Sequence, residues 1–303
     1  MSIINNANPG SSILIISTID KYLREQSGNT VSLDTLKQHL RPATLPNTPT
    51  GAERYGDNLA FWLKLGLWQL NGEEISIKLS DRELSFEHRV LKKIIEMTVD
   101  QTQFYEGNGV EPFSLCITGL INQSQYSFAG GSYLIGGSRS NVPTALLQYA
   151  NLNNENVPNQ SNESGPFLKW AQFLGFVEPI ATESTETAYC LDPTRAILPY
   201  LTNIFANKKT LDIQDFLQKL ATDLPMFSEG RFAKYLESTL HEPRLNKANN
   251  QIGAALSHAL LRLEAMNKIS FEQKSDDIKA MQLYLPQGMT ARLVSSISLR
   301  DLA

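Results

Sequence analysis

The pattern that decides the fold occurs at residues 61–68, FWLKLGLW, and again at residues 170–177, WAQFLGFV. In each copy, apolar residues at helical spacing lead to a glycine, Gly66 or Gly175, and an apolar run follows that glycine. Glycine adopts the left-handed backbone conformation that ends many helices without a steric penalty. Both copies therefore predict a helix that ends at the glycine and continues into a strand.

A β-hairpin is predicted after each of these junctions. In the first copy, residues 67–70 and 73–79 are predicted strands joined by the turn residues Asn71 and Gly72. In the second copy, a polar tip at residues 183–186 precedes a return strand at residues 188–191. Each junction thus joins a helix to a short two-stranded element.

A third copy is expected at residues 260–269, LLRLEAMNKI, where Asn267 takes the place of the glycine. Its hairpin is predicted from a strand at residues 269–271 and a return strand at residues 280–285. The polar tail from residue 287 to 303 is either a final strand or a docking segment.

A short helix also recurs, at residues 30–40 and 210–220, with the same cap position and apolar spacing. The order helix, helix, helix, hairpin is typical of a winged helix-turn-helix. The predicted fold class is therefore mainly α with small β-hairpins (α+β), arranged as tandem winged helix-turn-helix modules. The predicted divisions are module 1 at 1–80, a helical connecting region at 81–150, module 2 at 151–205 with an Asn-rich loop at 151–164, and module 3 with a C-terminal tail at 206–303.

The composition is that of a soluble globular protein with no overall affinity for nucleic acid. Apolar residues make up 42% of the 303 residues, and 27 Lys and Arg against 31 Asp and Glu give a formal net charge of -4. Any contact with DNA must then come from a local basic patch. Cys116 and Cys190 are too few for a disulfide framework, and the apolar run at 13–16 is too short to cross a membrane. We expect a cytoplasmic protein.

Motifs for catalysis and cofactor binding are not found in the sequence. The four histidines share no metal-binding motif, and no Gly-Lys-Ser/Thr follows the glycine-rich stretch at 130–139. We predict that this stretch is a loop and leave its role open. Residues 277–279, DIK, resemble the end of a nuclease carboxylate–lysine motif, but the other carboxylates of such a site are not apparent. The expectation is a protein that is not an enzyme and has no cofactor, metal site or catalytic residue.

Basic side chains on the predicted helices are the candidate contacts for DNA, because a winged helix places its third helix in the major groove. The third module is the richest in them, whereas acidic residues at the predicted wing tips oppose contact with phosphates. The candidate nucleic-acid-binding residues are Arg54, Lys64, Lys169, Arg231, Lys234, Arg244, Lys247 and Arg262.

The opening helix, the junction at residues 63–68 and its echo at residues 173–177 resemble a known family. They are similar to accessory winged-helix proteins of bacterial phage-defence islands, in particular the DpdG-like component of the 7-deazaguanine DNA modification and restriction cluster. The resemblance implies that the protein is a partner in a DNA-targeting complex. It implies also that the protein is not the enzyme that edits or cuts DNA. It is also compatible with the winged-helix subunits that clamp SMC-type ATPases.

These features lead us to expect a non-catalytic subunit of a multi-protein, DNA-related complex, in bacterial anti-phage defence. Its expected partners are other protein subunits and double-stranded DNA as an auxiliary contact, with no membrane, and a homo-oligomer stays open. Two alternatives also stay open. One is a sequence-specific DNA-binding transcriptional regulator, and the other is a metal-dependent nuclease with carboxylates assembled from distant segments.

Overall fold

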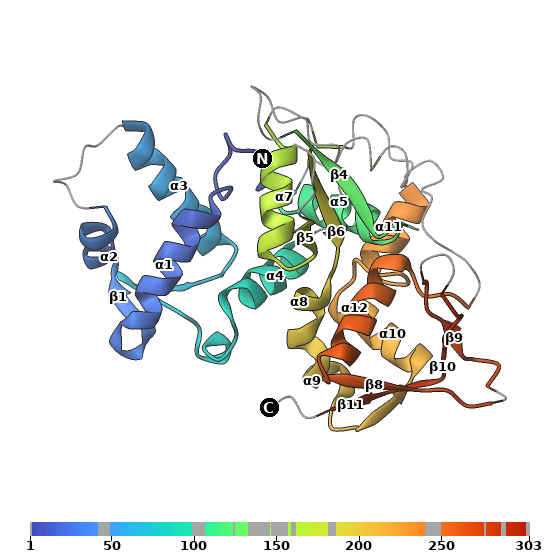
Figure 1. Ribbon diagram of the computed structural model, residues 1–303. Helices are drawn as coiled ribbons and strands as arrows, with labels where there is room; N and C mark the ends of the chain where they lie inside the picture. The colour runs from blue at the N-terminus through green and yellow to red at the C-terminus, as the bar shows by residue number, and fades with distance from the viewer. Residues whose placement is uncertain are drawn as a thin grey trace.

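The computed structural model shows a mixed α+β protein of many helices and small antiparallel sheets, which confirms the predicted α+β class (Figure 1). The first helices (blue) lie at one end of the molecule, and the last helix and strands (orange to red) lie at the other. The structure describes residues 2–41, 49–98, 107–123, 125–132, 146, 157–158, 162–180, 186–239, 250–275, 277–285 and 289–300.

Three of the sheets have three strands each and share one strand order. In every case the strand that comes last in the sequence lies in the centre and pairs with both others. In chain order, the sheets are β1 (Thr30–Ser32), β2 (Gln69–Asn71) and β3 (Glu74–Ser76); β4 (Ser127–Ser132), β5 (Val177–Ile180) and β6 (Glu186–Leu191); and β7 (Thr210–Asp212), β8 (Ile269–Glu272) and β11 (Ser296–Leu299). We call the three sheets with their helices the first, second and third units.

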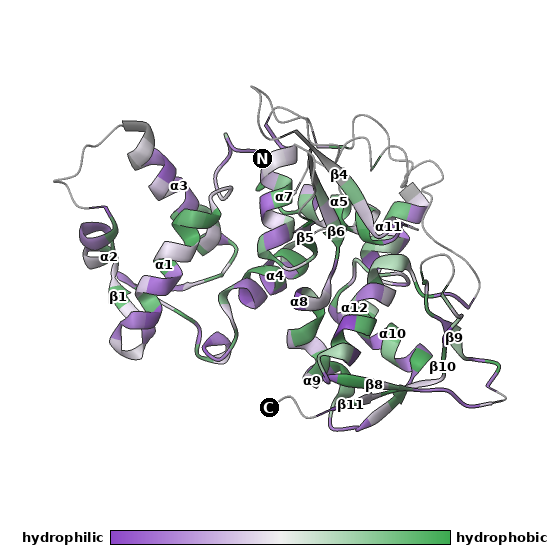
Figure 2. Ribbon diagram, viewed as in Figure 1, coloured by the Kyte–Doolittle hydropathy of each residue, from purple (hydrophilic) through white to green (hydrophobic). Residues whose placement is uncertain are grey.

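Two helices of the first unit begin at serine caps. Ser12 and Ser32 accept hydrogen bonds from the amides of Ile15 and Thr35, which satisfies N–H groups that have no partner within the helix. The helices are α1 (Ile13–Glu25), α2 (Leu33–Leu40) and α3 (Pro49–Lys64). In Figure 2, α2 at the edge of this unit is largely hydrophilic, which agrees with Leu36 as its one buried residue.

The second unit has a completely buried helix at its centre. Every residue of α5 (Glu111–Ile121) is buried, and α4 (Phe86–Met97) and α7 (Ser164–Phe173) contact it. A helix buried on all sides lacks the amphipathic period by which a surface helix is recognised. The polar residues of α5, Glu111, Ser114 and Thr118, form hydrogen bonds within the fold. The helices of the third unit are α8 (Thr194–Ile197), α9 (Leu201–Phe205), α10 (Ile213–Asp223), α11 (Arg231–Thr239) and α12 (Ala254–Ala265).

The three predicted junctions are confirmed, since a residue in the left-handed conformation follows the end of α3, α7 and α12. The φ angles of Gly66, Gly175 and Asn267 are 75°, 80° and 56°. At each junction this residue donates its N–H to the carbonyl three residues earlier, and the next residue donates to the carbonyl five residues earlier. The six N···O distances lie between 2.8 and 3.1 Å.

The predicted return strand of the third unit is wrong. Within residues 280–285, only β9 (Met281–Gln282) is a strand, and it pairs with β10 (Leu293–Val294) in a separate sheet. The return strand is β11, from the tail, and it pairs with β8 over four residues. An alternating apolar pattern predicts a strand but does not determine which strand it pairs with. Here β11 takes the central position, because it buries Ile297 completely.

Strand β4 lies in the range predicted as a connecting region, 81–150, and pairs with β6 of the second unit. Gly130 and Gly131, at the start of the stretch predicted as a loop, are part of this strand. Residues 133–139 lie outside the described residues, as does most of the predicted Asn-rich loop. None of the described helices is long and apolar enough to cross a membrane.

Candidate nucleic-acid interface

The structure brings two of the predicted DNA-contacting residues together. Arg54 on α3 and Lys169 on α7 line one cleft, although they belong to different units. Lys64 is exposed at the end of α3 and does not line this cleft. Arg244 and Lys247 lie outside the described residues.

The cleft, which we call the α1–α3–α7 cleft, has a volume of ≈ 620 Å³, which is within the usual size range of ligand sites. Arg54 and Lys169 are exposed, and neither forms an ion pair within the described part of the chain. Among the described residues, those that line the cleft include two cations and several hydroxyl or amide groups, but no carboxylate. They are Asn6, Ser11, Ser12, Ile13, Leu14, Ser17, Arg54, Pro166, Lys169, Trp170, Gln172 and Phe173.

The two tryptophans of the repeated junctions hold the walls of this cleft in place. The indole N–H of Trp62 donates to the carbonyl of Gly10 at 3.1 Å, and that of Trp170 donates to the carbonyl of Ile3 at 3.0 Å. The two rings contact each other with centroids 5.7 Å apart. The N-terminal segment, residues 2–12, is thereby fixed against the first and second units at the same time.

Further hydrogen bonds connect α1 to α3 beside Arg54. The side-chain oxygen of Asn58 accepts from the amide of Ser12 at 3.0 Å, and its nitrogen donates to the carbonyl of Arg54 at 2.7 Å. Gly10 has a φ of 83° and lies against the Phe61 ring, where a Cβ would come within 2.3 Å of a ring carbon. The backbone around the cleft therefore has little freedom to change on binding.

Arg231 and Lys234, on α11, line a different groove of ≈ 680 Å³ between α10 and α11. The Arg231 guanidinium donates to the carbonyls of Ile95 at 2.6 Å and Thr98 at 3.3 Å, at the C-terminal end of α4. A cation is stabilised there by the helix dipole. Lys234 lies 3.6 Å from Glu229. Arg231 therefore has a structural role in joining α11 to α4.

Arg262 on α12 forms an ion pair with Asp192, whose carboxylate is buried. The other carboxylate oxygen of Asp192 accepts from the amide of Thr194 at 3.1 Å, at the start of α8. Removal of a cation from a buried carboxylate is costly. Arg262 therefore holds α12 against the start of the third unit, and its guanidinium is committed to that contact.

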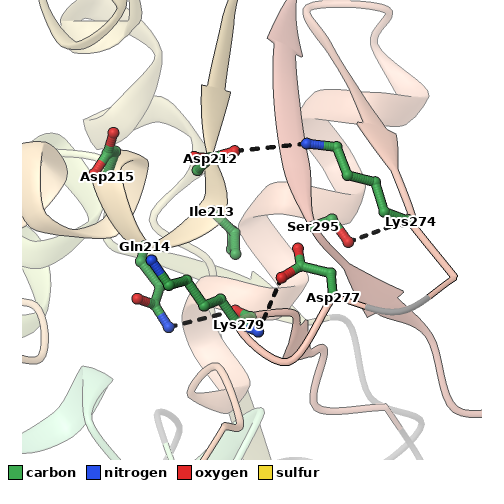
Figure 3. A pocket seen from close by; sticks show the side chains of 8 residues that line it. All are labelled: Asp212, Ile213, Gln214, Asp215, Lys274, Asp277, Lys279 and Ser295. Carbon is green, nitrogen blue, oxygen red and sulfur yellow. Dashed lines mark hydrogen bonds and ion pairs between the residues drawn. The ribbon is translucent and has the colours of Figure 1, made fainter.

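Asp277 and Lys279, from the segment that resembled a nuclease motif, line a pocket of ≈ 400 Å³ beside β7 and β11 (Figure 3). Asp277 accepts from the amide of Lys279 at 2.9 Å, and this hydrogen bond lowers the pKa of the carboxyl group. Asp212 faces Lys274 at 3.9 Å, whereas Asp215 points away from Asp277. Among the described residues, no group of three or more Asp, Glu, His or Cys side chains is placed to hold a metal ion.

A cysteine–histidine contact was not anticipated from the sequence. Cys190 Sγ on β6 lies 3.4 Å from His258 Nδ1 on α12, and the ring of Tyr126 meets the histidine edge-on. Burial raises the pKa of the Cys190 thiol, which keeps it protonated and poorly nucleophilic. Neither residue lines a cleft described above. The two residues are distant in the sequence and share no motif, so only the fold reveals their contact.

Comparison with known proteins identifies the family of this chain. The family model described as DpdG-like matches residues 1–277 of the chain. The chain belongs to the DpdG-like family. Membership associates this DpdG-like protein with DNA modification and defence. No curated protein and no solved structure matches it.

Proposed function

We propose that this DpdG-like protein is a non-catalytic subunit of a multi-protein anti-phage defence complex in the bacterial cytoplasm. In this proposal its three units are winged helices, its main role is to bind other protein subunits, and double-stranded DNA is an auxiliary contact. The observation that carries the proposal is the threefold repeat of one strand order together with the same left-handed helix end. A winged helix has this order, in which a strand after the first helix pairs with the return strand of the hairpin.

Two features favour a role in protein assembly over sequence-specific recognition of DNA. The third helices of the first two units, α3 and α7, pack against each other through Trp62 and Trp170, so part of each helix is covered. In the third unit, Arg231 and Arg262 are engaged in contacts within the chain. A DNA-binding regulator needs exposed base-reading side chains along each recognition helix. Lys169 is the only exposed residue of α7, and Arg262 and Ala265 are the only exposed residues of α12.

The nuclease alternative rests on one observation: Asp212, Asp215 and Asp277 line one pocket with two lysines, although Asp215 points away from Asp277. Its test is incubation of the protein with plasmid and linear DNA in Mg²⁺ or Mn²⁺. Under our proposal, no cleavage is expected above that of an Asp277→Asn variant. Metal-dependent cleavage that this variant abolishes would replace the proposed non-catalytic role.

The assembly role is tested by co-expression with the proteins encoded beside it in its defence cluster, followed by size-exclusion chromatography with light scattering. We expect a complex of fixed stoichiometry that survives moderate salt. A chain that elutes alone in every combination would overturn the assembly role. DNA binding is measured separately, by fluorescence anisotropy of labelled duplex DNA over a salt series.

A further inference from the structure

We propose that the α1–α3–α7 cleft binds phosphate groups of a DNA backbone, with Arg54 and Lys169 as the residues that contact them. This inference rests on the auxiliary DNA contact of the proposed function and assigns it to one place. The basic residues of the sequence led us to expect a DNA contact at the third unit. The cleft instead lies between the first and second units.

The charge of the cleft is opposite in sign to that of the whole chain. The formal net charge is -4, yet the side chains that line this cleft include two cations and no carboxylate. The pocket beside β7 mixes Asp212, Asp215 and Asp277 with lysines, and the groove between α10 and α11 has Glu229 beside its cations. Where the charged side chains among the described lining residues are all cations, the cleft attracts an anionic ligand.

The neutral groups of the cleft also suit a phosphate. Ser12 brings a hydroxyl from the start of α1 and Gln172 brings an amide from α7, whereas the hydroxyls of Ser11 and Ser17 already donate to the carbonyls of Asn6 and Leu14. Hydroxyl, amide, Arg and Lys side chains are the usual partners of DNA phosphates, and such contacts carry no sequence information. The cleft is therefore suited to position a nucleic acid and not to read its bases.

The two cations lie on separate units whose relative position is fixed. Trp62 and Trp170 contact each other, and both hold the N-terminal segment. Arg54 and Lys169 consequently meet a ligand without a domain movement, and a preorganised site loses less entropy on binding. Each residue alone is an ordinary exposed cation, but together they form one site.

The test compares the charge reversal Arg54→Glu/Lys169→Glu with the control Lys21→Glu/Lys37→Glu, which alters the net charge equally. Lys21 and Lys37 are exposed lysines of the first unit that do not line the cleft. All three proteins are titrated against labelled duplex DNA over a salt series. We expect the cleft variant to bind at least about tenfold more weakly, and its salt slope to fall by about 1 for each phosphate that it no longer neutralises. The control is expected to change binding much less.

Three outcomes separate the possible failures. If the wild type binds DNA and both double variants weaken it equally, the cleft is not the site, although the DNA contact stands. If the wild type shows no binding at low salt, the inference and the auxiliary DNA contact both fail, and the assembly role is still judged by co-expression. If a free deoxynucleoside monophosphate displaces DNA at an equal concentration of nucleotide, the ligand is a nucleotide and the backbone assignment is wrong. Circular dichroism melting of each variant confirms that it is folded.

Discussion

Asp20 of α1 is the residue whose contacts most strongly join the first unit to α4. Its buried carboxylate receives the guanidinium of Arg89, the indole N–H of Trp68 at 3.0 Å and the Nε of Arg24 at 3.1 Å. The side chains of Asp20 and Arg89 are 2% and 1% exposed. A buried carboxylate with three donors is well compensated, and the loss of Arg89 would leave it with Trp68 and the partly exposed Arg24 and without its buried cation.

Arg89→Met is therefore expected to lower the free energy of unfolding by about 3–5 kcal/mol. The matched control is Arg24→Met, which removes a partly exposed cation from the same carboxylate and is expected to cost about 1 kcal/mol or less. Urea unfolding of both variants measures the difference. Equal losses would show that burial does not set the strength of these contacts.

His88 gives the stability a predictable dependence on pH. Burial and the nearby Lys92 lower its pKa from the ordinary value of 6.5, and Asp81 acts in the opposite direction. The folded state thus binds a proton less readily than the unfolded state, so stability is full above pH 6.5 and is lost as the pH falls below that value.

His88→Phe is expected to keep a ring beside Tyr200, whose ring centroid lies 4.5 Å from that of His88, and to remove the titrating group. Between pH 7 and about pH 5, the free energy of unfolding should therefore fall less for the variant than for the wild type. Urea unfolding at several pH values measures both slopes. A slope that is unchanged in the variant would assign the acid sensitivity to other groups.

At the scale of elements, the repeated helix ends differ in how tightly their left-handed residue is packed. A Cβ on Gly175 would lie 2.6 Å from the Cβ of Arg195 and 2.9 Å from the amide nitrogen of Ala196. A Cβ on Gly66 would meet only the flexible end of Lys78, at 3.4 Å. The two glycines therefore share a conformational requirement but not a steric one.

Gly66→Ala is expected to cost about 1–2 kcal/mol, the strain of a left-handed alanine. Gly175→Ala should cost a further 1–3 kcal/mol, roughly, because the backbone of α8 must move to admit the methyl group. Thermal and chemical unfolding of the two variants checks this order. A larger loss at Gly66 would contradict it.

Helix ends could be predicted from the sequence, because a left-handed residue after an apolar helix is a local signal. The choice of β11 as the return strand could not, since it depends on which distant strand fills the centre of the sheet. The candidate site divides in the same way. Arg54 and Lys169 were each identified as basic positions on a third helix, but their common cleft follows from the contact of Trp62 with Trp170.

For the whole molecule, the N-terminal segment is one of the structural connections between the first two units. Ile3 is completely buried, its amide donates to the carbonyl of Gly109 at 2.8 Å, and its carbonyl accepts from Trp170. Ile3→Ala should therefore lower the free energy of unfolding by about 2–5 kcal/mol.

Because Ile3 contacts the second unit, hydrogen exchange of the Ile3→Ala variant should accelerate in α7 as well as in the first unit. Leu14→Ala is the control, because Leu14 is 76% exposed, and its effect is expected to stay within about 0.5 kcal/mol. Faster exchange confined to the first unit would show that the segment does not couple the two.

The position of this segment also bears on how the chain folds as it is synthesised. Ile3 is synthesised well before its partner Trp170, which follows it 167 residues later in the chain. During that interval Ile3 has no second unit to pack against. Exposed apolar surface of this kind is what chaperones recognise on nascent chains. The first unit, although it is made first, is completed only after α7 has emerged.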